Sequence, residues 1–145
     1  MLSLGVVVSH FRLMCLAGLL LVMLVSSLQA ADVPQFGPPF VVPVEADGVQ
    51  RITVILDSYS YSPNYLVVQS GKPVELTLTS VTTITPHNFV IKELAIEQDV
   101  GAGKTVTIKF TPTHPGVFPI YCDKRLWPLP SHRDKGMEGR LEVKP

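Results

Sequence analysis

Cysteine is scarce in this chain of 145 residues, which contains only 2 of them, Cys15 and Cys122. Cys15 lies in an apolar N-terminal run, so Cys122 is the single cysteine of the remaining sequence. In an oxidising compartment a single cysteine cannot form an internal disulfide, which excludes a disulfide-stapled scaffold. Cys122 is therefore either an inert buried thiol or a metal ligand.

Charge is also scarce, because charged residues make up 17% of the chain and the formal net charge is zero. An average domain has about 25% charged residues. A neutral chain gives no support to nucleic-acid binding, and we expect no nucleic-acid partner. The sequence also lacks a Ser-His-Asp arrangement, a carboxylate pair and a glycine-rich phosphate loop that rise above chance. We therefore expect no enzymatic activity.

An uncharged apolar run occupies residues 13–28, directly after Arg12, and small residues follow it. This pattern is typical of a secretory signal peptide over residues 1–30, with cleavage after Ala30. The mature protein is then periplasmic or otherwise exported, with no stable membrane insertion after cleavage. An uncleaved N-terminal membrane anchor is the alternative, although the run is short for the ~20 residues that a bilayer requires.

Residues 31–49 are rich in proline and predict an extended arm, with an edge strand near residues 40–44. Residues 50–145 then form one domain, long enough for a sandwich core. Apolar residues recur there at period two or in short runs between turn signals, at 52–56, 65–68, 74–78, 89–91, 105–110, 117–121 and 141–143. This pattern predicts an all-β antiparallel sandwich or barrel. The only helical candidate is 94–99.

Four candidate metal ligands follow one another in the chain: His87, Cys122, His132 and Met137. A soft thiolate, two imidazoles and a weak thioether are the ligand set of a blue-copper electron-transfer site. We therefore expect one mononuclear copper. Three strong ligands and a weak axial group leave little room for a substrate, which favours electron transfer over catalysis at the metal.

Asn88 directly follows His87 and is expected to support the site without binding the metal. Its side chain would hydrogen-bond toward the Cys122 loop and tie the two ligand loops together. The alternative is an ordinary turn asparagine.

Nine residues, 123–131, separate Cys122 from His132 and include an apolar Leu-Trp-Pro-Leu-Pro segment. If it is exposed, this segment is a docking patch for a redox partner protein near Trp127 and His132. In the alternative, Trp127 folds down and shields the metal from water.

The ligand order and its surroundings resemble the cupredoxin family, in particular plastocyanin and pseudoazurin, over roughly residues 50–145. The resemblance is carried by Pro-His-Asn at 86–88, Tyr-Cys at 121–122, His132 and Gly-Met-Glu-Gly at 136–139. It implies a Greek-key β-sandwich and a type 1 copper for one-electron transfer, with His87, Cys122 and His132 as equatorial ligands and Met137 as the axial one. The interval before His132 is longer than in small cupredoxins and closer to that of nitrite reductase copper domains.

Two other functions remain open for the same residues. A periplasmic protein for copper tolerance, storage or delivery would need no redox partner, but the Met- or His-rich tail that usually marks such proteins is absent. A structural or accessory domain of an assembly would have an empty or zinc-filled site, since zinc accepts Cys and His readily.

Overall fold

The computed structural model describes residues 36–145. Segments with short apolar runs or alternating apolar residues form most of the strands of this region. The expected signal peptide, Cys15 and the start of the arm lie outside it. The described strands are β1 (Phe40–Val41), β2 (Gln50–Asp57), β3 (Ser60–Ser62), β4 (Tyr65–Gln69), β5 (Val74–Ser80), β6 (His87–Ile91), β7 (Ile96–Val100), β8 (Thr105–Phe110), β9 (Gly116–Tyr121) and β10 (Glu138–Lys144). Two 3₁₀ turns, η1 (Lys92–Leu94) and η2 (Arg133–Lys135), complete the elements of this region. None of its helices has the length and apolar character that crossing a bilayer requires.

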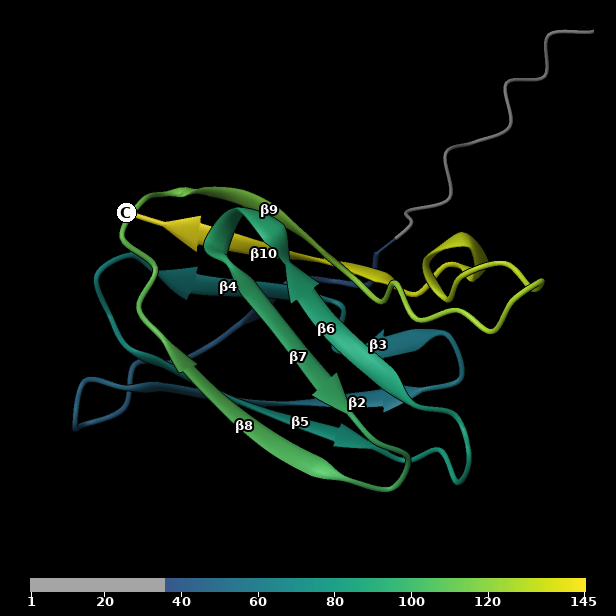
Figure 1. Ribbon diagram of the computed structural model, residues 1–145. Helices are drawn as coiled ribbons and strands as arrows, with labels where there is room; N and C mark the ends of the chain where they lie inside the picture. Colours follow the sequence, from purple (N-terminus) through teal and green to yellow (C-terminus); the bar gives the residue numbers. More distant parts are fainter. Residues whose placement is uncertain (1–35) are drawn as a thin grey trace, which may run out of the picture. The chain divides into compact units, whose positions relative to one another are not determined.

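The strands form two facing sheets, which confirms the predicted all-β sandwich (Figure 1). The larger sheet has the order β1-β4-β10-β9-β6-β7 and the smaller one the order β3-β2-β5-β8. The sheets are mixed, whereas the sequence led us to expect antiparallel pairing. β2 runs parallel to β5, and β10 runs parallel to β4. β2 and β5 can run parallel because the chain passes into the larger sheet for β4 before it returns.

The core lies between the sheets and follows the predicted alternation. In β5 the residues Val74, Leu76 and Leu78 are buried, and the residues between them are partly exposed. Each fully buried aliphatic side chain of this kind contributes roughly 1.5–3 kcal/mol through apolar burial. Cys122 and Met137 belong to the same buried cluster. Two of the expected ligands are therefore part of the hydrophobic core.

The predicted helix at residues 94–99 is wrong. Ile96–Val100 forms strand β7, which pairs antiparallel with β6 along its whole length. The segment alternates between partly or fully buried residues and exposed ones, a period of two that suits a strand. Only the preceding Lys92–Leu94 is helical, as a single 3₁₀ turn.

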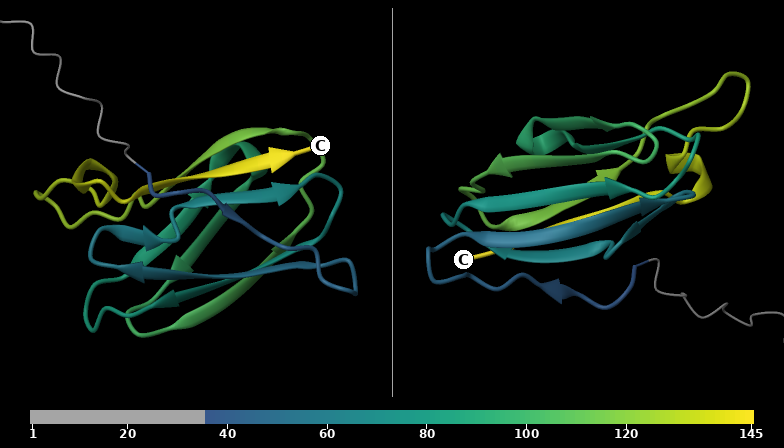
Figure 2. Two further views of the ribbon diagram at one scale, coloured as in Figure 1. Left: turned by 180° about the vertical axis from the view of Figure 1, so that it is seen from behind. Right: turned by 90° about the horizontal axis from the view of Figure 1, so that it is seen from below.

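The described part of the proline-rich arm lies along the edge of the larger sheet (Figure 2). β1 pairs parallel with β4, and Val42 is 2% exposed and belongs to the core. The guanidinium carbon of Arg140 lies 4.2 Å from the centre of the Phe36 ring, and Gly37 N donates a hydrogen bond of 3.0 Å to Asn64 Oδ1. These contacts cover the edge of β4, an edge that would otherwise be open to another strand.

Gly139 permits the close approach of β10 to the chain before β4. A Cβ atom at this position would lie 2.6 Å from the carbonyl oxygen of Asn64. Because that oxygen also accepts a hydrogen bond of 2.8 Å from Arg140 N, it is not free to move away. We expect Gly139→Ala to lower the free energy of unfolding by about 1–3 kcal/mol, the usual cost of overpacking.

Urea unfolding of the metal-free protein measures this change, and Gly101→Ala is the matched control. A Cβ atom at Gly101 meets only the flexible Lys104 side chain, at 3.3 Å. The control should change the stability by less than about 0.5 kcal/mol. Equal unfolding midpoints for the two variants would contradict the packing argument.

Candidate metal centre

The structure brings together three of the four predicted ligands. His87 begins β6, Cys122 directly follows β9, and His132 precedes the turn η2. The Nδ1 atom of His132 lies 3.4 Å from the Sγ atom of Cys122 and 3.2 Å from the Nδ1 atom of His87. One ligand atom from each residue lies within 4.8 Å of the others. All three are buried, with His132 the most accessible at 9%.

The spacing of these atoms fits a trigonal metal site. Nitrogen and sulfur ligands at ordinary bond lengths around a trigonal metal lie roughly 3.5–3.8 Å from one another. The two separations of 3.2 and 3.4 Å are shorter by a few tenths of an ångström. Only a small opening of the cluster is therefore needed to admit an ion. Two imidazoles and a thiolate are the strong ligands of the trigonal blue-copper site, so the residues present fit copper.

Burial keeps the imidazoles in the form that binds metal. It lowers the pKa of His87. A positive charge on the neighbouring His132 would lower this pKa further, whereas Asp57 acts in the opposite direction. Burial also lowers the pKa of His132, and Lys135 adds to the effect. Both rings are consequently neutral at neutral pH. Burial raises the pKa of the Cys122 thiol, so this group keeps its proton until a cation displaces it.

Met137 lies beside the cluster and is held there by its main chain. Its side chain is fully buried, at 0% exposure. Met137 N donates a hydrogen bond of 3.0 Å to the carbonyl of His132, and its own carbonyl accepts one of 3.2 Å from Cys122 N. The main chain of Met137 is thus hydrogen-bonded to the main chains of two other predicted ligands, His132 and Cys122.

Asn88 connects the strand of His87 to the loop of Cys122. Its Nδ2 atom donates to Asp123 Oδ1 at 2.7 Å, and Asp123 N donates back to Asn88 Oδ1 at 3.1 Å. Asn88 N lies 3.4 Å from the Cys122 sulfur and donates to it. Asn88 is 1% exposed and sits within β6, so it is not an ordinary turn asparagine.

Tyr61 is a further neighbour of the cluster, one that we did not single out from the sequence. Its hydroxyl donates a hydrogen bond of 2.6 Å to the carbonyl of Asn88. Burial raises the pKa of this hydroxyl, and the adjacent Cys122 and Asp123 raise it further. The residue therefore acts as a neutral hydrogen-bond donor that holds the main chain of β6 next to the thiol.

The segment between Cys122 and His132 forms a loop with a closed base. His132 N donates a hydrogen bond of 2.9 Å to the carbonyl of Lys124, so the two ends of the loop lie side by side. The loop projects from the end of the sandwich opposite the C-terminus (Figure 1). At its tip, Leu126 is 75% exposed and Trp127 is 80% exposed. In this structure Trp127 therefore does not cover the cluster.

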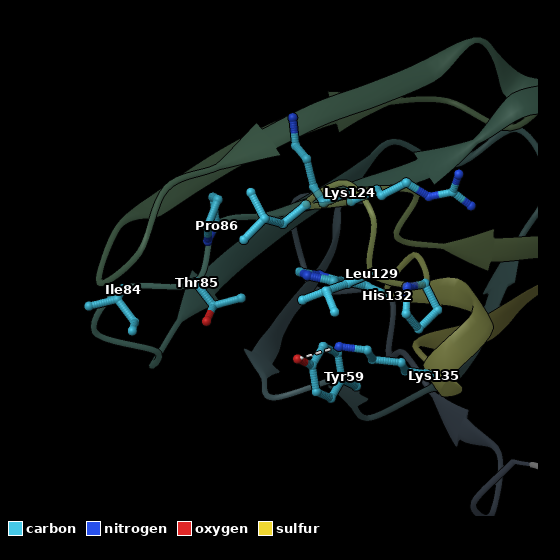
Figure 3. Close-up of a pocket in the computed structure, with 11 residues that line it drawn as sticks. Tyr59, Ile84, Thr85, Pro86, Lys124, Leu129, His132 and Lys135 are labelled. Atoms are coloured by element: carbon cyan, nitrogen blue, oxygen red, sulfur yellow. Dashed lines mark hydrogen bonds between the residues drawn. The ribbon is translucent and has the colours of Figure 1, made fainter.

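A pocket of about 430 Å³ opens beside His132. Its apolar lining includes Ile84, Pro86 and Leu129. Figure 3 shows the Lys135 side chain reaching Tyr59 on one wall, whereas the Lys124 side chain points away from the pocket. Of the three clustered residues, His132 is thus the one whose imidazole faces this pocket.

We expect Asn88→Ala to weaken the link between the two ligand loops. The substitution removes both side-chain bonds to Asp123 and should lower the free energy of unfolding by about 1–3 kcal/mol, because buried polar groups lose their partners. Thermal unfolding of the metal-free protein measures the effect, and copper affinity should fall with it. Gln98→Ala is the matched control, since the amide of Gln98 bonds only the neighbouring carbonyl of Asp99 at the surface. A loss no larger than that of the control would show that the link is dispensable.

Known structures share this fold at low sequence identity. The metal-binding domain of the Cu(I)-exporting P-type ATPase CopA of Streptococcus pneumoniae D39 matches with a TM-score of 0.59 and 21% identity, over 74% of this chain and 97% of its own. Reduced auracyanin of Roseiflexus castenholzii matches with a TM-score of 0.55 and 21% identity, over 66% of this chain and 97% of its own. Auracyanin A of Chloroflexus aurantiacus, described as a "blue" copper protein, matches with a TM-score of 0.51 and 17% identity, over 67% of this chain and 100% of its own.

No curated protein matches the sequence closely enough to count as a relative. The family model of the cupredoxin-like domain, in contrast, matches residues 16–135, which is well over half of the chain. The fold, the ligand order and this match agree with one another. The chain belongs to the cupredoxin-like family.

Proposed function

We propose that this protein is an exported, copper-binding carrier of single electrons. The observation that supports the proposal best is the buried cluster of His87, Cys122 and His132, which has the donor types of a blue-copper site. In this proposal His87, Cys122 and His132 would hold one mononuclear copper as its strong ligands, and the thioether of Met137 would be a weak fourth one. The bound ion supplies the chemistry of reversible exchange between Cu(I) and Cu(II).

The residues around the cluster suit electron transfer because they restrict movement of the ligands. The backbone of Met137 is bonded to both Cys122 and His132, and Asn88 links the strand of His87 to the loop of Cys122. A site that changes little between oxidation states needs little reorganisation. The surrounding core also excludes water from the thiol, which is 0% exposed. Three strong ligands and a weak fourth one would also leave little room for a substrate at the metal, which favours a carrier over an enzyme.

Export is part of the proposal and bears on Cys122, which is a free thiol among the described residues and has no cysteine to pair with there. An oxidising compartment would threaten such a thiol unless a metal occupied it. The apolar run at residues 13–28 supplies the export signal that the proposal requires. Retention of this run as a membrane anchor would leave the copper function unchanged.

A redox partner protein would dock at the exposed tip of the loop that ends at His132. Leu126, Trp127 and Leu129 are 75%, 80% and 50% exposed and form an apolar patch there. The patch adjoins the pocket on which the imidazole of His132 opens. A partner seated on the patch would therefore lie close to the ligand through which an electron leaves the site.

Copper loading tests the proposed ligand set. We expect the protein with Cu(II) to show an intense visible absorption from charge transfer between the Cys122 thiolate and copper. Cys122→Ser should abolish this absorption, because an alcohol cannot replace the soft thiolate, while circular dichroism verifies that the variant is folded. A colourless copper complex, or a Cys122→Ser variant that keeps the colour, would overturn the proposal.

Copper retention separates the carrier from a protein of copper tolerance, storage or delivery. We expect the protein to keep its copper through repeated cycles of oxidation and reduction in the presence of a Cu(I) chelator, because the ligands are buried and held by the main chain. Metal analysis after each cycle measures the retention. Ready release of Cu(I) to the chelator would favour the delivery function instead, and zinc in protein purified from its native compartment would favour an accessory domain.

A further inference from the structure

Tyr59 has an unusual backbone conformation for a large side chain. It lies in the two-residue turn between β2 and β3 and has a φ angle of 60°. This left-handed conformation is common for glycine and tolerated by asparagine, but it is unfavourable for a bulky residue. A residue held in such a conformation suggests that its side chain is needed where the backbone places it.

The Tyr59 ring contacts the imidazole of His132. The two ring centres are 5.1 Å apart, and the planes meet at 77°, which is an edge-to-face arrangement. Tyr59 comes from a turn of the smaller sheet, whereas His132 lies in the loop between two strands of the larger sheet. The contact therefore joins the two sheets at the metal centre.

Lys135 contacts both Tyr59 and His132 (Figure 3). Its Nζ atom lies 4.3 Å from the centre of the Tyr59 ring and donates a hydrogen bond of 2.9 Å to the Tyr59 hydroxyl. Its main-chain N donates a hydrogen bond of 3.1 Å to the carbonyl of His132. The same residue thus holds the main chain of His132 and the ring that packs on its imidazole.

Among the three clustered ligands, His132 depends most on such support. His87 is fully buried within a strand, and Cys122 directly follows one. His132 lies at the end of the long loop, and its imidazole lines the open pocket. The opposite wall of the pocket includes Ile84, which is 86% exposed and can offer little restraint (Figure 3).

We propose that Tyr59 is a positioning residue for His132 and that Lys135 fixes Tyr59 in place. The ring keeps the imidazole oriented with Nδ1 toward Cys122 and His87, so that the ligand set is assembled before copper arrives. This inference rests on the proposed copper function for its consequence, but the positioning itself belongs to the metal-free protein. Tyr59 is not among the proposed ligands and would act only through His132.

The first test uses the metal-free protein. Tyr59→Asn removes the ring and suits the left-handed backbone, Tyr59→Phe keeps the ring, and Ile84→Ala is the control on the opposite side of the pocket. NMR should show one sharp set of His132 ring resonances in the wild type, in Tyr59→Phe and in the control. In Tyr59→Asn these resonances should broaden or double, while the apo fold is retained because the substitution relieves the turn.

The second test uses the copper-loaded protein. Tyr59→Asn should change the intensity ratio of the visible absorption bands and speed the loss of Cu(I) to a chelator by about threefold to tenfold, the equivalent of a lost aromatic pair. Tyr59→Phe should restore the wild-type spectrum and most of the retention. Lys135→Met, which removes the ammonium group and keeps the chain length, should give a smaller change in the same direction as Tyr59→Asn.

The outcomes separate this inference from the proposed function. If wild-type protein shows the thiolate absorption but Tyr59→Asn keeps wild-type His132 resonances, spectrum and copper loss, the positioning role is wrong and the copper function stands. If wild-type protein shows no thiolate absorption, the copper function is wrong, and the resonances of His132 in the metal-free variants still decide the positioning role. Unfolding of Tyr59→Asn without recovery in Tyr59→Phe would also overturn the inference.

Discussion

The metal centre depends on the reciprocal hydrogen bonds between Asn88 and Asp123. His87 is the first residue of β6, and Cys122 directly follows β9. These two strands are paired at one position only, Val90 with Tyr121. A ladder this short cannot by itself fix two side chains that are 35 residues apart in the chain. The side-chain bonds of Asn88 and Asp123 continue the connection beyond the ladder. The position of the Cys122 thiol relative to the His87 imidazole follows from the hydrogen bonds of Asn88 with Asp123.

Burial imposes a second constraint on the centre. A thiol and two imidazoles placed among Leu, Ile and Phe side chains lose water, and this loss favours their neutral forms. The pKa of each histidine is lowered by burial, and that of Cys122 is raised. The cluster therefore exists as a set of neutral groups within hydrogen-bonding distance, which a hydrophobic core tolerates.

Much of this arrangement could be predicted from the sequence, for identifiable reasons. Period-two alternation in segments such as 74–78 located the strands, and the order of donor residues indicated which chain segments meet. The direction of pairing could not be predicted, because a strand shows the same alternation next to a parallel or an antiparallel neighbour. The segment 94–99 was mistaken for a helix because Glu, Gln and Leu favour helices, while its pairing with β6 decides its structure.

The roles of two tyrosines also lie beyond the reach of the sequence. Neither Tyr61 nor Tyr59 lies in a motif that indicates a role at the site. Their contacts with Asn88 and His132 depend on how two sheets pack, and the spacing of residues along the chain does not encode that packing directly. The left-handed turn at Tyr59 is likewise a product of tertiary structure, since sequence patterns would favour Gly or Asn at that position.

The closed base of the loop before His132 makes its tip an independent unit. Since His132 N and the carbonyl of Lys124 are joined by one hydrogen bond, residues 125–131 leave and re-enter the domain at a single point. Ser131 and Arg125 at the ends of this segment contact Asp134, so the part that can change most freely is the exposed tip around Trp127, which is 80% exposed. The surface of this loop and the donor set below it can change separately in such a protein, and the tip is the natural position at which to graft a new binding segment.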